Sequence, residues 1–151
     1  MKITEPFHFD FFVPMRPQPL QRARTLKNGF SYTPKESRDA KAYIRHEAIE
    51  YLKSKGIEEP MEGIVKIRID AYFEKPKCWY EGKPVTGGGD WDNLGKTVSD
   101  ALNAVLYKDD RQIQQGAIFK HYGDRIGFEV AGVIEPIPEK PRKTRKKVKN
   151  A

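Results

Sequence analysis

Residues 87–102, GGGDWDNLGKTVSDAL, place carboxylates where a loop gives way to a helix. Three glycines lead into Asp90, and Asp92 and Asn93 follow as a helical pattern begins. An acidic residue at a helix start can cap the free N–H groups and complement the helix dipole. That interpretation accounts for one of these aspartates, but not for both behind a flexible loop. The alternative is a cation site.

Further polar residues extend this pattern. Asp92 and Lys96 are i, i+4 neighbours on the polar face of the expected helix, with Asp100 at its edge, and Asp109 and Asp110 follow the helix. Taken singly, each is typical of a turn or a surface ion pair of little energy. Carboxylates without His or Cys nearby, however, suit the hard cations Mg²⁺ or Mn²⁺. Aspartates with a lysine can support metal-assisted phosphodiester hydrolysis.

Hydrophobic periodicity predicts the elements that must position these residues. Strands are expected over 7–13, 64–73, 112–122 and 125–134, and helices over 35–55 and 92–105. The order β-α-β-α-β-β indicates an α/β (α+β) fold, a single small domain with one mixed sheet of about four strands. Gly123-Asp124 predicts a hairpin between the last two strands. Asn28-Gly29 lies in a stretch that predicts a long loop or a small hairpin.

Positive charge is concentrated in two segments. The net charge is +7, and residues 139–151 contain seven basic residues and one acidic residue. Residues 16–45 hold eight basic residues against two acidic ones, which leaves the rest of the body net acidic. This separation indicates an anion-binding surface beside an acidic pocket. The tail is expected to be disordered and to attract DNA without sequence preference.

Composition also limits the class of protein. The single cysteine, Cys78, excludes an internal disulfide and fits a reducing compartment. The sequence has no apolar run of membrane-spanning length, and charged residues interrupt its N-terminal apolar stretch. We expect a cytoplasmic protein that does not bind a membrane.

These motifs together resemble the RusA-type crossover junction endodeoxyribonucleases, a Holliday junction resolvase family. The matching positions are Asp90-x-Asp92-Asn93-Leu94-x-Lys96, Asp100-Ala101-Leu102, Asp109-Asp110-x-Gln112-Ile113 and Lys120. The resemblance implies that Asp90, Asp92, Asp110 and Lys96 are catalytic and that the three aspartates bind Mg²⁺ (or Mn²⁺). It also implies a homodimer that resolves four-way DNA junctions by paired symmetric nicks in recombination and repair. Residues 1–137 would then be a RusA-like nuclease domain, and residues 138–151 a disordered basic tail.

Other residues have weaker signals. Arg16, Arg22 and Arg24 are predicted to contact DNA phosphates, with Phe30 or Tyr32 stacking on exposed bases; a solvated loop is the alternative. Lys120 and His121 alternate on a strand, so only one of them can face the site, and the resemblance favours Lys120 as a DNA contact. The aromatic residues around the glycine loop, Trp79, Tyr80 and Trp91, are expected to pack in the core rather than wedge into DNA.

Several alternatives remain open at this stage. The chain can also be interpreted as a non-catalytic binding module for branched or single-stranded DNA with a structural cation site, or as an RNA-processing nuclease. A helix that reached residue 105 would leave five steps of at most ~17 Å for Asp110 to return to Asp92. Asp110 therefore either requires a sharp chain reversal or acts in trans across a dimer.

Overall fold

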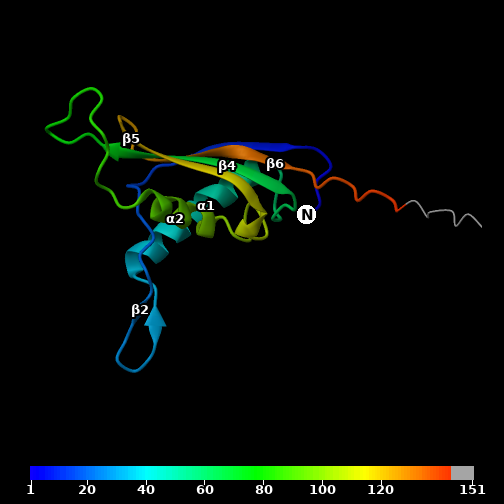
Figure 1. Ribbon diagram of the computed structural model, residues 1–151, viewed down its shortest axis with the longest axis horizontal. Coiled ribbons are helices and arrows are strands. Elements are labelled where there is room, and N and C mark those ends of the chain that lie inside the picture. The colour runs from blue at the N-terminus through cyan, green and yellow to red at the C-terminus, as the bar shows by residue number, and fades with distance from the viewer. Residues whose placement is uncertain (144–151) are drawn as a thin grey trace, which may run out of the picture.

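The computed structural model describes residues 1–143, and its centre is a mixed four-stranded sheet (Figure 1). The strand order is β1-β6-β4-β5, and only the β4–β5 pair is parallel. The strands are β1 (Phe7–Val13), β4 (Ile64–Glu74), β5 (Ile113–Gly123) and β6 (Gly127–Glu135). The predicted fold class is confirmed. The part of the predicted basic tail from residue 144 onward lies outside the described residues.

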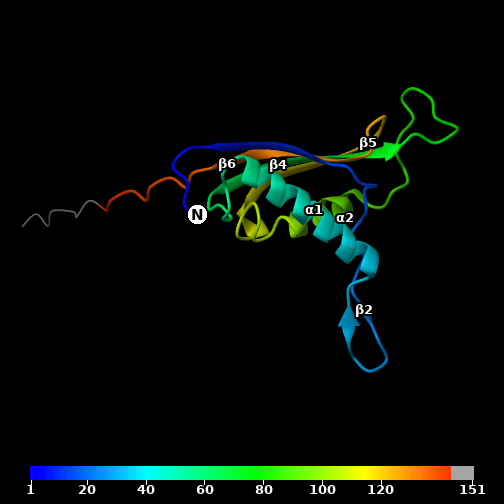
Figure 2. The same ribbon diagram turned by 180° about the vertical axis from the view of Figure 1, so that it is seen from behind.

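Two helices, α1 (Lys35–Ser54) and α2 (Trp91–Ala101), lie on the same face of this sheet (Figures 1 and 2). Alternate residues of the strands point toward them, because successive side chains in a strand face opposite ways. Phe9 and Ile69 from the sheet, with Ile44 from α1 and Val98 from α2, lie in one buried cluster. Gly95 lets α2 approach β5 closely, since a Cβ there would lie 2.0 Å from Ile118.

Helix α2 is shorter at its C-terminal end than the periodicity predicts. It ends at Ala101, and the chain then reverses within a few residues. Ala104 adopts a positive φ of 61°, and its N–H donates to the carbonyl of Tyr107 at 2.8 Å. The buried hydroxyl of Tyr107 donates in turn to the carbonyl of Ser99 at 2.7 Å, and burial raises the pKa of this phenol. This reversal carries the Asp109-Asp110 pair back toward the helix.

The predicted hairpin at Gly123-Asp124 is wrong. Strands β5 and β6 are not paired with each other, because β4 lies between them and pairs with both. The short connection at residues 124–126 must therefore cross two inter-strand spacings, about 10 Å, which four Cα steps can span. Helix α2 makes this order possible, since it links β4 to β5 and lets the two strands run parallel.

A small two-stranded ribbon projects from the body, as Figures 1 and 2 show. It consists of β2 (Arg24–Thr25) and β3 (Ser31–Tyr32), which are antiparallel. The turn includes Gly29 at φ +86°, and the N–H of Gly29 donates to the carbonyl of Leu26 at 3.0 Å. Of the two forms predicted for this segment, the small hairpin is the one observed.

Candidate active site

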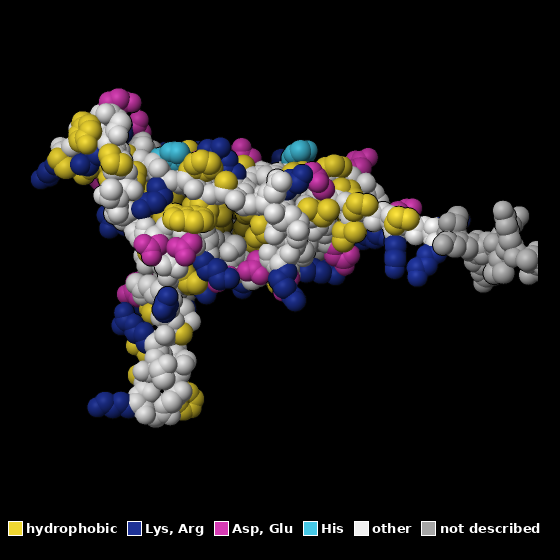
Figure 3. Space-filling model, viewed as in Figure 1, with side chains coloured by type: hydrophobic (Ala, Val, Ile, Leu, Met, Phe, Trp, Pro, Cys, Tyr) yellow, Lys and Arg dark blue, Asp and Glu magenta, His cyan; other side chains and the backbone are white. Residues whose placement is uncertain are grey.

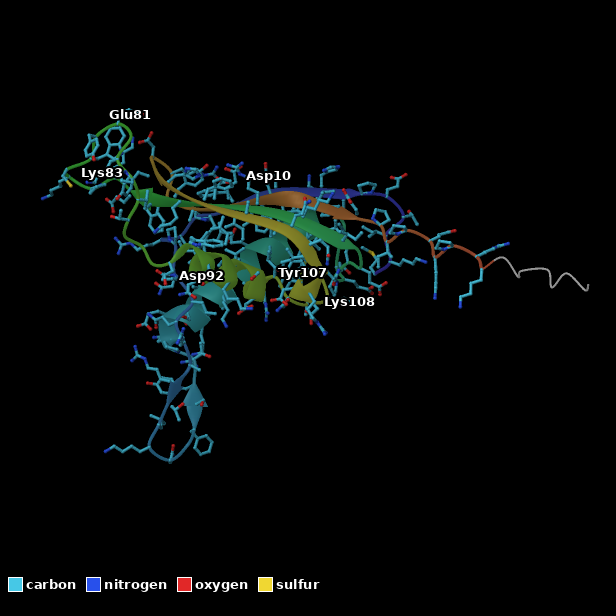
Figure 4. The ribbon with its side chains drawn as sticks, in the orientation of Figure 1. Asp10, Glu81, Lys83, Asp92, Tyr107 and Lys108 are labelled. Carbon is cyan, nitrogen blue, oxygen red and sulfur yellow. The ribbon has the colours of Figure 1, made fainter. Side chains whose placement is uncertain are left out.

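Asp90 and Asp92 lie at the start of α2, and capping does not account for their carboxylates. Asp90 is the N-cap residue, but its side chain makes no capping hydrogen bond. Its backbone carbonyl accepts from the N–H of Leu94 at 3.1 Å, so the backbone alone begins the helix. Both aspartates are exposed, and Asp92 lies where the projecting ribbon meets the body (Figure 4). Figure 3 shows acidic side chains gathered at this place.

The preceding loop has a conformation that only glycine fits well. Gly88 and Gly89 adopt φ values of +80° and +91°. A Cβ would lie 2.3 Å from the Phe73 ring at Gly88, and 2.7 Å from Pro19 at Gly89. At Gly87, by contrast, a Cβ would meet nothing within 4 Å. Two of the three glycines are therefore required by backbone conformation and space, and they fix the position from which Asp90 enters the helix.

Lys120 of β5 forms hydrogen bonds with the same loop. Its ammonium group donates to the carbonyls of Gly87 at 2.6 Å and Gly89 at 2.9 Å. His121, the next residue, instead approaches the carboxylate of Asp70 at 2.7 Å. The predicted alternation is thus observed, and Lys120 is the residue of the two that reaches the site. In the structure it positions the loop; contact between Lys120 and DNA stays a prediction.

Lys96 connects the two parts of the acidic pattern. Its ammonium group lies 3.1 Å from Asp100 and 3.4 Å from Asp110. The hydrogen bond to Asp100 is the larger cause that raises the pKa of Lys96, and Asp110 adds to it. Lys96 therefore remains a cation at neutral pH. Asp92 lies one helical turn before Lys96 on the same helix, and Asp110 reaches the Lys96 ammonium group from beyond the chain reversal.

The neighbouring aspartates Asp109 and Asp110 have different surroundings. The Asp109 carboxylate accepts from the backbone N–H of Arg111 at 2.8 Å and caps the short 3₁₀ helix η1 (Asp110–Gln112). That backbone hydrogen bond, with the Arg111 guanidinium, lowers the pKa of Asp109. Asp110 instead points to Lys96. The structure thus gives Asp109 a structural role and pairs Asp110 with Lys96, while the catalytic role of Asp110 stays a prediction.

A groove of about 260 Å³ runs between α2 and the sheet beside these residues. Asp92 and Lys96 line it, together with Trp91 and apolar side chains of β4 and β5. A second cavity, of about 560 Å³, adjoins the glycine loop and is lined by Arg16, Gly87 and Gly88 among others. The groove therefore borders Asp92 and Lys96, and the second cavity lies beside the loop that leads to Asp90.

The donor set suits a hard cation. In the described part of the chain, no three His, Cys, Asp or Glu side chains form a group that could hold a metal ion by themselves. Mg²⁺ does not require such a group, since it is usually bound by one or two carboxylates, with waters and substrate phosphates completing the octahedron. Carboxylates near Lys96 fit a cation that is bound together with a phosphodiester. Coordination by Asp90, Asp92 and Asp110 stays a prediction.

Comparison with family models identifies the chain. The model described as endodeoxyribonuclease RusA matches residues 14–131. The chain belongs to the RusA family. The match covers every residue predicted to be catalytic, and the sequence resemblance is confirmed. A search of curated proteins finds no significant match.

Membership of the RusA family supports a DNA endonuclease of the junction-resolving kind in general. No helix within residues 1–143 is long and apolar enough to cross a membrane.

The three arginines predicted to contact DNA are exposed. Arg16 is exposed and lies 3.9 Å from Glu74, a pair too solvated to fix its position. Arg22 and Arg24 are exposed on the projecting ribbon. These positions are compatible with phosphate binding, which stays a prediction.

Two features escaped the sequence analysis. The aromatic residues Trp79, Tyr80 and Trp91 are 37%, 57% and 61% exposed, so the expectation of core packing is wrong. Their neighbours are glycines, lysines and aspartates, a composition that already indicated an exposed loop. Asp70 was also missed: it is buried on the sheet face opposite the helices and is bound by Arg68 and His121.

Proposed function

We propose that this RusA-family protein is a Mg²⁺-dependent, structure-specific endonuclease that resolves four-way DNA junctions by paired symmetric nicks. The observation that carries the proposal is the return of Asp110 to Lys96. Asp110 lies 14 residues beyond Lys96 in sequence, yet its carboxylate is 3.4 Å from that ammonium group. This contact brings one aspartate of the DD pair to the helix that begins at the DxDN motif, and it supports a site built within a single chain.

Each residue has a defined role in this proposal. Asp90, Asp92 and Asp110 would hold Mg²⁺, which when bound supplies a water of lowered pKa and charge stabilisation at the phosphate. Hydrolysis at this site would add water to phosphorus and break the bond from phosphorus to the 3′ oxygen, which would leave a 5′-phosphate and a 3′-hydroxyl. Lys96 supplies a fixed positive charge as negative charge develops on the phosphoryl oxygens. Gly88, Gly89 and Lys120 hold the loop that presents Asp90.

Paired cleavage requires a second site related to the first by symmetry. A four-way junction has approximate two-fold symmetry, and a two-fold dimer presents two identical sites to it. We therefore propose that the chain acts as a homodimer. The contact between Asp110 and Lys96 within one chain favours sites whose Asp92, Lys96 and Asp110 come from the same subunit.

A non-catalytic binding module is the second candidate, because the described residues contain no preformed three-carboxylate site. The Asp92→Asn variant distinguishes the two functions. It keeps a residue of the same size at an exposed position, so the fold should persist. If the chain is a nuclease, this variant loses junction cleavage in Mg²⁺ but still binds the junction in a gel-shift assay. Wild-type protein that binds the junction but does not cleave it in Mg²⁺ or Mn²⁺ would instead support the binding module.

A further inference from the structure

The projecting ribbon, here called the arm (residues 22–32), is fixed beside the candidate site. The backbone N–H of Leu20 donates to the carbonyl of Asn93 at 3.0 Å, in the first turn of α2. The N–H of Gln21 donates to the buried Oγ of Ser37 at 2.9 Å, in the first turn of α1. At its other end the arm runs into α1 at Lys35. The segment that leads into the arm is therefore held beside the start of α2, which carries Asp92 (Figure 4).

The arm is also a preformed structure. Leu26 and Phe30 are joined by a backbone hydrogen bond of 2.7 Å, and the Asn28 side chain accepts from the N–H of Phe30 at 3.2 Å. The hydroxyl groups of Thr25 and Ser31 are 3.3 Å apart across the ribbon. These contacts set the register without help from the body.

That register separates two kinds of side chain onto two faces. Arg24 pairs with Tyr32, and Thr25 pairs with Ser31. Since successive residues alternate faces, Leu26 and Phe30 share the face of Arg24 and Tyr32, while Thr25 and Ser31 lie on the other. The apolar side chains on this face are open to solvent: Leu26 is 50% exposed, Phe30 is 71% exposed and Tyr32 is 44% exposed.

The charge of the segment indicates what covers this face. Residues 11–35 contain no Asp or Glu but include the basic residues Arg16, Arg22, Arg24, Lys27 and Lys35. Figure 3 shows basic side chains along the arm and a hydrophobic one at its tip. Basic groups neutralise phosphates, and aromatic rings stack on bases whose faces are open. A continuous duplex offers phosphates but hides the base faces inside the stack, whereas a branch point can expose them.

We propose that the arm recognises the branch point of the DNA substrate, with Phe30 and Tyr32 stacking on bases there and Arg22, Arg24 and Lys27 binding the adjacent phosphates. This inference rests on the proposed function. It assigns the preference for branched over linear DNA to the arm, and it places the bound branch a fixed distance from Asp92.

The test measures binding rather than cleavage. Asp92→Asn protein is titrated against an immobile four-way junction and a linear duplex of the same sequence, and 2-aminopurine at the branch reports stacking. Phe30→Ala in this background should weaken junction binding about tenfold, remove the 2-aminopurine change and leave duplex binding unchanged. Lys27→Ala should weaken the binding of both substrates alike and reduce the dependence of binding on salt concentration. Tyr43→Ala, which removes a 39% exposed aromatic residue from α1, is the matched control and should change the binding of neither junction nor duplex.

Three outcomes would overturn the inference. One is that Phe30→Ala weakens the binding of junction and duplex equally, and another is that it weakens the binding of neither. The third is that Phe30→Ala changes the oligomeric mass of the protein without DNA while the preference for the junction survives. The arm would then form a contact between subunits. If the Asp92→Asn protein with an intact arm shows no junction preference, the proposed function fails. If the preference exists and survives Phe30→Ala, only this inference fails.

Discussion

At the residue scale, Lys96 is the charge around which the proposed site is organised. It pairs with Asp100 on its own helix and with Asp110 from beyond the chain reversal. Raised pKa values of this kind keep a lysine charged well above neutral pH. The catalytic role proposed for Lys96 therefore depends on its position and not on a proton transfer near pH 7.

We predict that Lys96→Met lowers the rate of junction cleavage about 100- to 1000-fold, the usual effect of removing one preorganised electrostatic group. Lys96→Arg keeps the positive charge but carries it on a planar guanidinium group, so this variant should retain part of the rate. Single-turnover rates on a labelled junction measure both. Because the pKa of Lys96 is raised, the wild-type rate should not fall through loss of the Lys96 proton at any pH near neutrality. Equal rates for wild type and Lys96→Met would contradict the role.

The sequence indicated which residue types meet at the site, but not the division of labour between neighbours. Asp109 and Asp110 are chemically identical, and only the family resemblance favoured the second. The structure gives a physical reason, because Asp109 is held by the backbone N–H of Arg111. That contact depends on the 3₁₀ turn, which hydrophobic periodicity does not reveal.

At the element scale, the glycine loop and α2 act together to present Asp90. We predict that Gly89→Ala destabilises the fold by about 1 kcal/mol or more, because alanine resists a positive φ. A displacement of about 1 Å at Asp90 would also lower cleavage roughly 100-fold. Gly87→Ala, in open space, is the control and should be close to wild type in chemical denaturation and in cleavage. Similar behaviour of the two variants would contradict this account of the loop.

Asp70 joins β4 to β5 on the face opposite the helices. Burial alone would raise its pKa, but hydrogen bonds from Arg68 and His121 bring the pKa below its ordinary value. A carboxyl group with a lowered folded-state pKa contributes stability above its unfolded pKa, about 3.9, and loses it as pH falls through the folded value. We predict that Asp70→Asn lowers the free energy of unfolding by about 2 kcal/mol at pH 7, and that this difference from wild type shrinks below about pH 4. Urea unfolding at several pH values measures it; a difference independent of pH would contradict the prediction.

Local periodicity predicted the strands and helices well, yet not their order in space. The bounds of β1 were predicted correctly because its aromatic residues alternate. The hairpin at Gly123-Asp124 was wrong because pairing with β4 is a long-range contact that a two-residue turn signal does not encode. The predicted helix to residue 105 was too long because Leu102 and Val105 continue the apolar pattern through the reversal, where Leu102 is buried and Val105 packs against the core.

At the scale of the whole molecule, the proposal combines two identical sites in a dimer. A mixed dimer of Asp92→Asn and Asp110→Asn subunits tests whether each site comes from one chain. The contact between Asp110 and Lys96 within one chain predicts that this mixed dimer cuts neither strand, while a dimer of wild-type and Asp92→Asn subunits cuts one. A single nick by the doubly substituted mixed dimer would show that the site is shared between subunits.

The most direct test of the central claim compares Asp110→Asn with Asp109→Asn on an immobile four-way junction in Mg²⁺, with EDTA as the metal-free control. Asparagine caps as well as aspartate, so the Asp109 variant should fold and cleave like wild type. We predict paired cuts by wild type and Asp109→Asn, none by Asp110→Asn, and none by any of them in EDTA. Cleavage by Asp110→Asn at the wild-type rate, or cleavage that persists in EDTA, would contradict the account.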